Sequence, residues 1–413
     1  MKRFRKAASA ILAIVLAAAL GTGAFADGAP LGESGTVDNA GESVRILKEI
    51  TVYNPDEVTV NAPEISFSYA IEPGSASKSV RDADGVHVAV RSGVGSPVIT
   101  GEGSGDNTLV WSPADDTLSA NAEGAANTKY MDIDFSAVEF GAAGVYRYVV
   151  RESVSGYESN GVVEGSGGHV RFLDVYVRDG SGEGAGAWDV YGFALFCSDS
   201  DIDAAAVSAV GKTAGFVSGE GRTADTYYTF NFTVSNAIVN DSFAASTHIK
   251  FPFTVSLVNE TVTADVLPIV QIADSTLADQ DAPGVGAVSR TLNAQLAHGG
   301  EIRYIGIPTG TTVTVVERNG VQGATYESRS EGAGIDAQPK AIYTDESSNE
   351  AEINNGAAAL AAAGANQTAA FTNTLLQISP TGVVLRLAPF VLLFAAGAAL
   401  LLISRRAKKA AEL

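Results

Sequence analysis

Three polar side chains occupy apolar positions of strand-like segments, where a polar group needs a partner. The segments are VRILKEITVY, YRYVVRESV and TFNFTVSNAI. Successive side chains of a strand point to opposite faces, and in each segment the apolar face also carries one polar residue, namely Lys48, Glu152 or Asn236. Because an unpaired polar group is costly to bury, the sequence predicts that these three side chains lie together in one core.

An amine, a carboxylic acid and a carboxamide in one apolar environment can form a covalent bond. Burial lowers the pKa of a lysine and raises that of a glutamate, so a neutral amine and a protonated acid can coexist. The Lys48 amine can then attack the Asn236 carboxamide while Glu152 transfers protons and polarises the carbonyl. Ammonia leaves, and a Lys–Asn isopeptide bond remains after a single turnover without external substrate. Asn231, on the more polar face of the same segment, is the alternative acceptor.

The elements that position these residues are predicted to be strands. Period-two patterns such as EISFSYAI and HVRFLDVYVRDG alternate with turns rich in Gly, Asp, Ser and Pro, which is typical of all-β sandwiches. The patterned region is too long for one sandwich, and it repeats a plan of opening, middle and closing strands. We therefore expect two tandem immunoglobulin-like β-sandwiches, at 44–236 and 237–375, after a flexible leader at 27–43.

The second unit repeats only part of the chemistry. Glu317 lies in register with valines, and Asn373 lies in register with Phe371, so both resemble the acid and acceptor of the first unit. Its opening segment, NAIVND, has no lysine; Lys250 alternates out of the apolar face, and Lys340 lies in a loop-like stretch. We expect no crosslink here, with Glu317 and Asn373 left as remnants or as a hydrogen-bonded pair.

Both ends of the chain carry targeting patterns. Residues 1–26 combine a basic start, an apolar run and an A-x-A ending, which predicts a signal peptide cleaved between Ala26 and Asp27. An uncharged stretch near the other end predicts a transmembrane helix at 383–404, and the basic tail at 405–413 is the kind found on the cytoplasmic side. We therefore expect the remainder of the chain on the extracellular face.

A short motif precedes this helix within 376–382. The order of ISPTG, an apolar helix and a basic tail resembles the sorting signal of Gram-positive wall proteins. In those proteins a sortase cleaves between Thr and Gly, which here implies Thr381 and Gly382, and joins the threonine to the cell wall or to a pilus subunit. The sequence departs from the usual pattern, because Ile-Ser replaces Leu-Pro and the proline follows one place later. The alternative interpretation is a plain juxtamembrane spacer.

The spaced residues of the first unit also resemble a known family. An opening lysine, a Y-x-Y-x-V-x-E strand and a closing asparagine resemble the FctA-type (T-antigen) isopeptide-forming pilin domain over 44–236. The second unit, which ends in FTNT, resembles the Cna-B-like repeats that often follow it. The resemblance implies that Lys48 and Asn236 are crosslinked, that Glu152 is the catalytic acid, and that the protein is a pilin-like or stalk subunit. Polymerisation stays open, because no segment matches the YPK context of a polymerising lysine.

Composition excludes several other classes of function. A net charge of −20 argues against nucleic acid or anionic lipid as a partner. The single cysteine, Cys197, cannot form an intramolecular disulfide. The four histidines stand apart, without a metalloprotease motif or a nucleophile elbow. We therefore expect no cofactor and no enzyme that acts on an external substrate.

Two loop features leave alternatives open. Asp199, Asp201 and Asp203 in SDSDID alternate in the way that hard cations prefer, but the glycine and distal glutamate of a calcium loop are missing, so a solvated loop is the favoured interpretation. Sandwich loops also carry binding sites readily. The alternative to a structural subunit is thus an adhesin of the same architecture, which binds a host surface ligand without polymerising.

Overall fold

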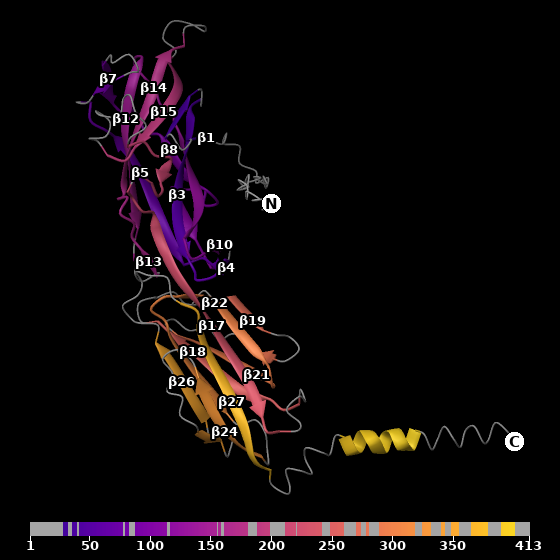
Figure 1. Ribbon diagram of the computed structural model, residues 1–413. Helices are drawn as coiled ribbons and strands as arrows, with labels where there is room; N and C mark the ends of the chain where they lie inside the picture. Colours follow the sequence, from indigo (N-terminus) through magenta and orange to yellow (C-terminus); the bar gives the residue numbers. More distant parts are fainter. Residues whose placement is uncertain are drawn as a thin grey trace, which may run out of the picture.

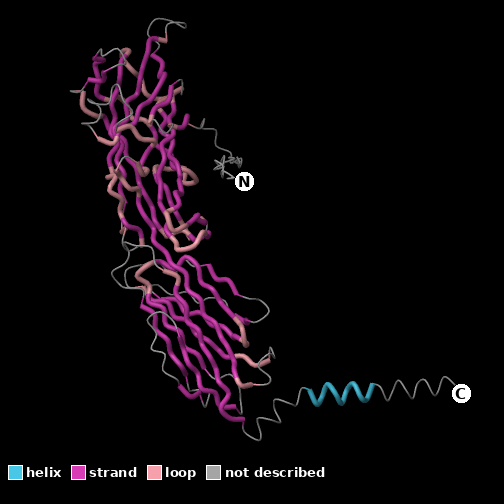
Figure 2. Tube along the Cα trace, viewed as in Figure 1, coloured by secondary structure: helices cyan, strands magenta, loops and turns pink. Residues whose placement is uncertain are grey.

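The computed structural model describes most of the chain between residue 28 and residue 378, together with one helix. The described residues are 28–31, 35–38, 41–76, 79–81, 87–113, 116–154, 156–157, 161–180, 188–198, 211–219, 221–241, 248–259, 270–273, 278–280, 289–318, 324–331, 340–342, 348–354, 365–378 and 390–400. Figure 1 shows two β-sandwiches arranged end to end in an elongated molecule. Strands account for nearly all of its regular structure (Figure 2), so the prediction of all-β tandem sandwiches is confirmed.

The first sandwich consists of two facing sheets. One has the order β8-β11-β3-β17, with short strands β1 and β16 paired to β3 and β13 paired to β17. The facing sheet has the order β2-β15-β14-β12-β5-β9, and β7 and β6 extend it beside β12. A separate ribbon joins β4 to β10. The strands are β1 (Ala29–Pro30), β2 (Thr36–Asp38), β3 (Ser43–Tyr53), β4 (Val58–Asn61), β5 (Ile65–Pro73), β6 (Ser79–Arg81), β7 (His87–Ser92), β8 (Val98–Gly101), β9 (Thr108–Trp111), β10 (Thr117–Ala120), β11 (Ala125–Asp134), β12 (Gly144–Val154), β13 (Val162–Val163), β14 (Val170–Asp179), β15 (Trp188–Phe196), β16 (Gly215–Phe216) and β17 (Asp225–Val239).

The second sandwich is built in the same way. One sheet contains β19, β22, β17, β27, β24 and β25 in that order, and the facing sheet has the order β20-β21-β18-β23-β26. The strands are β18 (Phe251–Val258), β19 (Val270–Ala273), β20 (Ala278–Gln280), β21 (Ser289–Leu296), β22 (Glu301–Pro308), β23 (Thr312–Arg318), β24 (Ala324–Glu331), β25 (Lys340–Ile342), β26 (Ser348–Asn354) and β27 (Gln367–Ile378).

Alternating burial explains why these segments form strands. In β5, Ile65, Phe67 and Tyr69 are buried, whereas Ser66 and Ala70 on the opposite face are exposed. The same alternation recurs along β18. Because each sheet buries one face against its partner, a pattern of period two is sufficient to specify which face turns inward.

One strand belongs to both sandwiches. The first residues of β17, Asp225 to Tyr228, pair with β3, whereas 229–239 pair with β22 and β27. Tyr227 lies in the first hydrophobic core and Phe230 already lies in the second. The predicted boundary after Asn236 therefore falls inside β17, and the two cores divide earlier. The reason is that β17 has 15 residues, of which only the first four pair with β3, so the strand continues into the second sandwich.

Part of the predicted flexible leader, 27–43, belongs to the fold. The strand β1 pairs in parallel with the start of β3, and Leu31 after it is buried in the first core. The strand β2 pairs with β15 at the edge of the facing sheet. Strands of two and three residues are too short to show a period, which is why the sequence pattern did not predict them.

The predicted ends of the chain are described only in part. A helix occupies 390–400 within the predicted transmembrane segment 383–404, and no helix among the described residues is long and apolar enough to cross a membrane. Several predictions lie outside the described residues altogether. These are the signal peptide and its cleavage site at Ala26 and Asp27, the sortase site at Thr381 and Gly382, the basic tail at 405–413 and the aspartates Asp199, Asp201 and Asp203.

Candidate functional site

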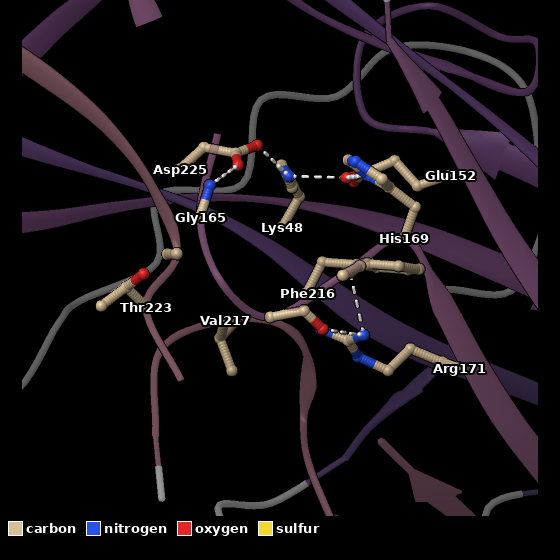
Figure 3. A pocket seen from close by; sticks show the side chains of 12 residues that line it. Lys48, Glu152, Gly165, His169, Arg171, Phe216, Val217, Thr223 and Asp225 are labelled. Atoms are coloured by element: carbon tan, nitrogen blue, oxygen red, sulfur yellow. Dashed lines mark hydrogen bonds and ion pairs between the residues drawn. The ribbon is translucent and has the colours of Figure 1, made fainter. Parts of the chain in front are cut away.

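A buried lysine lies between two buried carboxylates in the first sandwich. Lys48 on β3 places Nζ 2.9 Å from Oε1 of Glu152 on β12 and 2.6 Å from Oδ2 of Asp225 at the start of β17. The three side chains expose only 3 %, 2 % and 5 % of their surface. Figure 3 shows the lysine reaching from its own sheet toward the glutamate of the facing sheet, with the aspartate on its other side. The predicted neighbours Lys48 and Glu152 are thus brought together, and the third member of the cluster is Asp225.

The Asp225 carboxylate is held by two further donors. The backbone N–H of Gly165 donates to Oδ1 at 2.8 Å, and the Tyr157 hydroxyl donates to Oδ2 at 3.0 Å. One oxygen therefore receives a backbone hydrogen bond, while the other receives hydrogen bonds from Tyr157 and from Lys48. Burial, followed by the charge of Asp225, raises the pKa of Tyr157, so the phenol keeps the proton that it donates.

Aromatic rings enclose the lysine. Its Nζ lies 4.1 Å from the ring centroid of Phe67 and 5.9 Å from that of Phe216. A cavity of about 10 Å³ adjoins Lys48, Glu152 and Asp225, which is about the space that one water molecule needs. The amine is therefore shielded from bulk water and directed at its two carboxylate partners.

Glu152 has two partners besides the lysine. The Tyr69 hydroxyl donates to Oε2 at 2.7 Å, and Nδ1 of His169 lies 3.1 Å from Oε1. Burial acts to raise the pKa of Glu152, but the hydrogen bond to His169 and the charge of Lys48 outweigh it and hold the pKa below its ordinary value. The expectation of a glutamate with a raised pKa is therefore wrong for this site. It was based on burial and did not include His169, which the sequence pattern did not reveal.

The predicted acceptor Asn236 is not in this cluster. Its Nδ2 donates to the carbonyl oxygens of Leu296 and Ala297, and its Oδ1 accepts a hydrogen bond from Asn373, all in the second sandwich. The pairing of Lys48 with Asn236 is therefore corrected: β17 carries Asn236 out of the first sandwich before it can reach the lysine.

The alternative acceptor Asn231 lies at the junction of the two sandwiches. Its Nδ2 donates to Oδ1 of Asn54 at 2.8 Å and to Oδ2 of Asp56 at 3.0 Å, while its Oδ1 accepts hydrogen bonds from Asn54 and from the backbone of Gly306. Arg303 forms an ion pair with the same Asp56. Asn231 thus joins the two sandwiches and does not contact Lys48.

A second buried cluster contains Glu317 and Asn373. Asn373 Nδ2 donates to Oε1 of Glu317 at 2.6 Å, and the hydroxyl of Ser328 donates to the other carboxylate oxygen. Burial, opposed by these two hydrogen bonds, raises the pKa of Glu317 to about 7. The predicted pair is thus in contact, and Asn236 is its third member.

The two clusters occupy equivalent positions in their sandwiches. In the parallel pairing of β3 with β17, Asp225 lies opposite Ile50, two residues after Lys48. In the parallel pairing of β17 with β27, Asn373 lies opposite Ile238, two residues after Asn236. The glutamates come from equivalent facing strands, β12 and β23, paired with β5 and β18. Asn236 therefore occupies in the second sandwich the place that Lys48 occupies in the first.

Asp225 carried a signal that could have identified it. It lies in strand register with Tyr227, which is fully buried, and it opens the closing strand of the first sandwich. A carboxyl group gives the same amide product with an amine as a carboxamide does, and water leaves in place of ammonia.

Among the described residues no group of three or more His, Cys, Asp or Glu is arranged to hold a metal ion.

Comparison with known proteins gives distant structural similarity. No protein-family model and no curated protein sequence matches the chain. The major pilin T3.2 of Streptococcus pyogenes is 16 % identical, with 82 % of this chain and 99 % of that chain covered and a TM-score of 0.36. Another S. pyogenes major pilin structure is 16 % identical, with 80 % and 98 % covered and a TM-score of 0.34. A pilus-presented adhesin, Spy0125 (Cpa), is 13 % identical over 50 % of this chain and 36 % of that chain, with a TM-score of 0.22. With TM-scores this low, function has to be derived from the site.

Proposed function

We propose that the chain is a structural cell-surface protein, a pilin-like or stalk subunit, whose first sandwich is closed by an amide bond between Lys48 and Asp225. The observation that carries the proposal is the position of the Lys48 ammonium, buried between Asp225 at 2.6 Å and Glu152 at 2.9 Å. An ordinary ion pair needs one carboxylate, whereas amide formation needs an acceptor and a separate proton carrier. The reaction occurs once in each chain and has no external substrate.

Lys48, Asp225 and Glu152 can supply and accept every proton that the reaction requires. Lys48 passes one proton to Oδ2 of Asp225, which leaves a neutral amine beside a neutral carboxylic acid. The amine attacks Cγ, and the negative charge that develops on Oδ1 is stabilised by the N–H of Gly165. Glu152 takes a second proton from the nitrogen and returns it to the departing Oδ2 hydroxyl, which leaves as water. One C–N bond forms, one C–O bond breaks, and Glu152 is again a carboxylate.

The surroundings favour this direction of reaction. Tyr157 donates to Oδ2 and so stabilises the oxygen that departs. Because the adjoining cavity has a volume of about 10 Å³, it accommodates about one water. The product links residues 177 positions apart; by analogy with a disulfide, closing so long a loop stabilises the fold by about 5 kcal/mol.

Location at the cell surface belongs to the same proposal. The signal-peptide pattern and the sorting-like motif with Thr381 and Gly382 support secretion followed by attachment to the wall through a sortase. A protein with one cysteine that works outside the cell has no disulfide of its own, and an internal amide bond supplies a crosslink that reducing agents do not break.

Peptide mapping of the purified full-length protein by mass spectrometry tests the crosslink. We expect the wild type to yield a branched peptide that joins the Lys48 and Asp225 segments and is lighter than their sum by one water. Asp225→Asn should give the same branched product with loss of ammonia, whereas Asp225→Ala and Glu152→Ala should give linear peptides. Glu49→Gln, a change at the neighbouring buried position of β3, is the matched control and should crosslink normally. Linear peptides of full mass from the wild type would refute the proposal.

A further inference from the structure

One ionisable group connects the buried cluster to solvent. His169 lies just before β14, with one third of its side chain exposed. Its Nδ1 is 3.1 Å from Oε1 of the buried Glu152, and its Nε2 is 2.8 Å from Oε1 of Glu164. More than half of the Glu164 side chain is exposed. The imidazole therefore forms a single hydrogen-bonded chain from the proton carrier of the cluster to the surface.

Charge balance gives His169 a task that Lys48 cannot perform. Before the reaction, Lys48 is the cation nearest to Glu152 and Asp225. When the amide forms, the charges of Lys48 and Asp225 disappear together, but the Glu152 carboxylate stays buried. An uncompensated charge in the interior is strongly unfavourable, and His169 is the remaining side chain with a hydrogen bond to Glu152 that can carry a positive charge.

The other charged and titratable groups around His169 are consistent with this task. Tyr157 packs its ring 5.9 Å from the imidazole. Arg171, on β14, donates its hydrogen bonds to the backbone carbonyl oxygens of Gly215, Gly167 and Gly168. It acts on Glu152 through its charge, without a hydrogen bond to it. The hydrogen bond to Glu152 acts most strongly to raise the pKa of His169; burial acts against it, and Glu164 adds to the increase. The protonated imidazole is thus favoured by both carboxylates.

We propose that His169 is a positioning residue of the crosslinking site, which as an imidazolium held by Glu164 keeps Glu152 ionised and ready to accept the proton of Lys48. The inference rests on the proposed amide bond and adds a dependence on pH. Crosslinking then requires protonated His169, and its rate falls as the pH rises through the pKa of that residue.

The test follows the rate of crosslinking in newly made chains. The full-length chain is synthesised in a cell-free reaction, transferred to buffers between about pH 5.5 and pH 8.5, a range that brackets histidine titration, and quenched at intervals. The fraction of branched Lys48–Asp225 peptide is measured by mass spectrometry. His169→Gln keeps a hydrogen-bond donor but removes the charge. We expect its rate to be lower by about tenfold or more and to lose the fall at high pH.

Two further variants separate the charge of His169 from its packing. Glu164→Gln changes an exposed side chain, and we expect the falling limb of the pH profile to move to lower pH because Glu164 raises the pKa of His169. His169→Lys restores a positive charge, and its rate should stay high where that of the wild type falls. Glu72→Gln, at an exposed glutamate paired with Arg151, is the control and should follow the wild type.

The outcomes distinguish the two proposals. If the wild type never forms the branched peptide, the proposed crosslink itself fails and the role of His169 falls with it. If the wild type reacts but His169→Gln and Glu164→Gln react at the same rate with the same pH profile, the crosslink stands and the role of His169 is refuted.

Discussion

The equivalence of the two buried clusters predicts that one substitution creates a second crosslink. Asn236 occupies the register position in the second sandwich that Lys48 occupies in the first. It lies two residues before Ile238, the residue of β17 that is paired with the acceptor Asn373. Glu317 already contacts Asn373 at 2.6 Å, and Asn373 Oδ1 is buried without a hydrogen-bond partner among the described residues. Asn236→Lys should therefore supply the missing amine next to an acid and an acceptor that are in place.

The expected product differs chemically from the first crosslink. Because Asn373 is a carboxamide, its reaction with the new lysine releases ammonia, whereas Asp225 releases water. The acid is suited to the proton transfer, since burial raises the pKa of Glu317 to about 7. The new bond would span 137 positions and should stabilise the second sandwich by about 5 kcal/mol on the loop-closure estimate.

Mass spectrometry and denaturation together provide the assay. Asn236→Lys should lose one ammonia in addition to the water of the wild type, and the unfolding of its second sandwich should need more denaturant. Adding Glu317→Ala to this variant is the control and should abolish the loss of ammonia. If Asn236→Lys is folded by circular dichroism, keeps the first crosslink and still shows no loss of ammonia, the equivalence of the two sites is wrong.

Two further predictions concern stability. In the wild type, the buried Glu317 carboxyl, whose folded pKa is about 7, keeps its proton at pH values at which the unfolded chain releases it. The free energy of unfolding should therefore fall by about 3 kcal/mol as the pH rises from about 4.5 to 7. Glu317→Gln should remove most of this fall. Denaturant unfolding of both proteins at several pH values checks this, and parallel curves would contradict it. Asn231→Ala should lower the free energy of unfolding by about 1–3 kcal/mol, because Asn54 and Gly306 lose the hydrogen bonds that they donate to Asn231. Calorimetry measures the loss, and an unchanged unfolding temperature would show that the hydrogen bonds of Asn231 contribute nothing to stability.

Strand periodicity was sufficient to predict the fold and two members of the site. It assigned Lys48 and Glu152 to apolar faces of β3 and β12, and both are buried and in contact. It could not locate the acceptor, because alternation tells which face a residue occupies but not how far along a strand one sandwich ends and the next begins. Asn236 has the right face but lies in the second sandwich.

The remaining omissions have a common physical origin. Asp225 shares its register with Tyr227, but the same register continues through Thr229 and Asn231, so the pattern looked polar and the signal was missed. Gly165 contributes through its backbone N–H, and His169 stands at the end of a turn, so neither follows a periodic pattern. Groups that act from turns come together through tertiary structure alone, and a single sequence does not encode their proximity in any local spacing.

The sharing of β17 between the sandwiches determines how the protein responds to a pulling force. With Lys48 joined to Asp225, tension entering through β3 passes directly into the first residue of β17, and the 177 positions between them carry none of it. From there the load reaches β27 through the parallel ladder that joins it to β17, where the two strands slide against each other and many hydrogen bonds share the force. The first sandwich then acts as an inextensible link, and whatever lengthening the protein allows under load comes from the second.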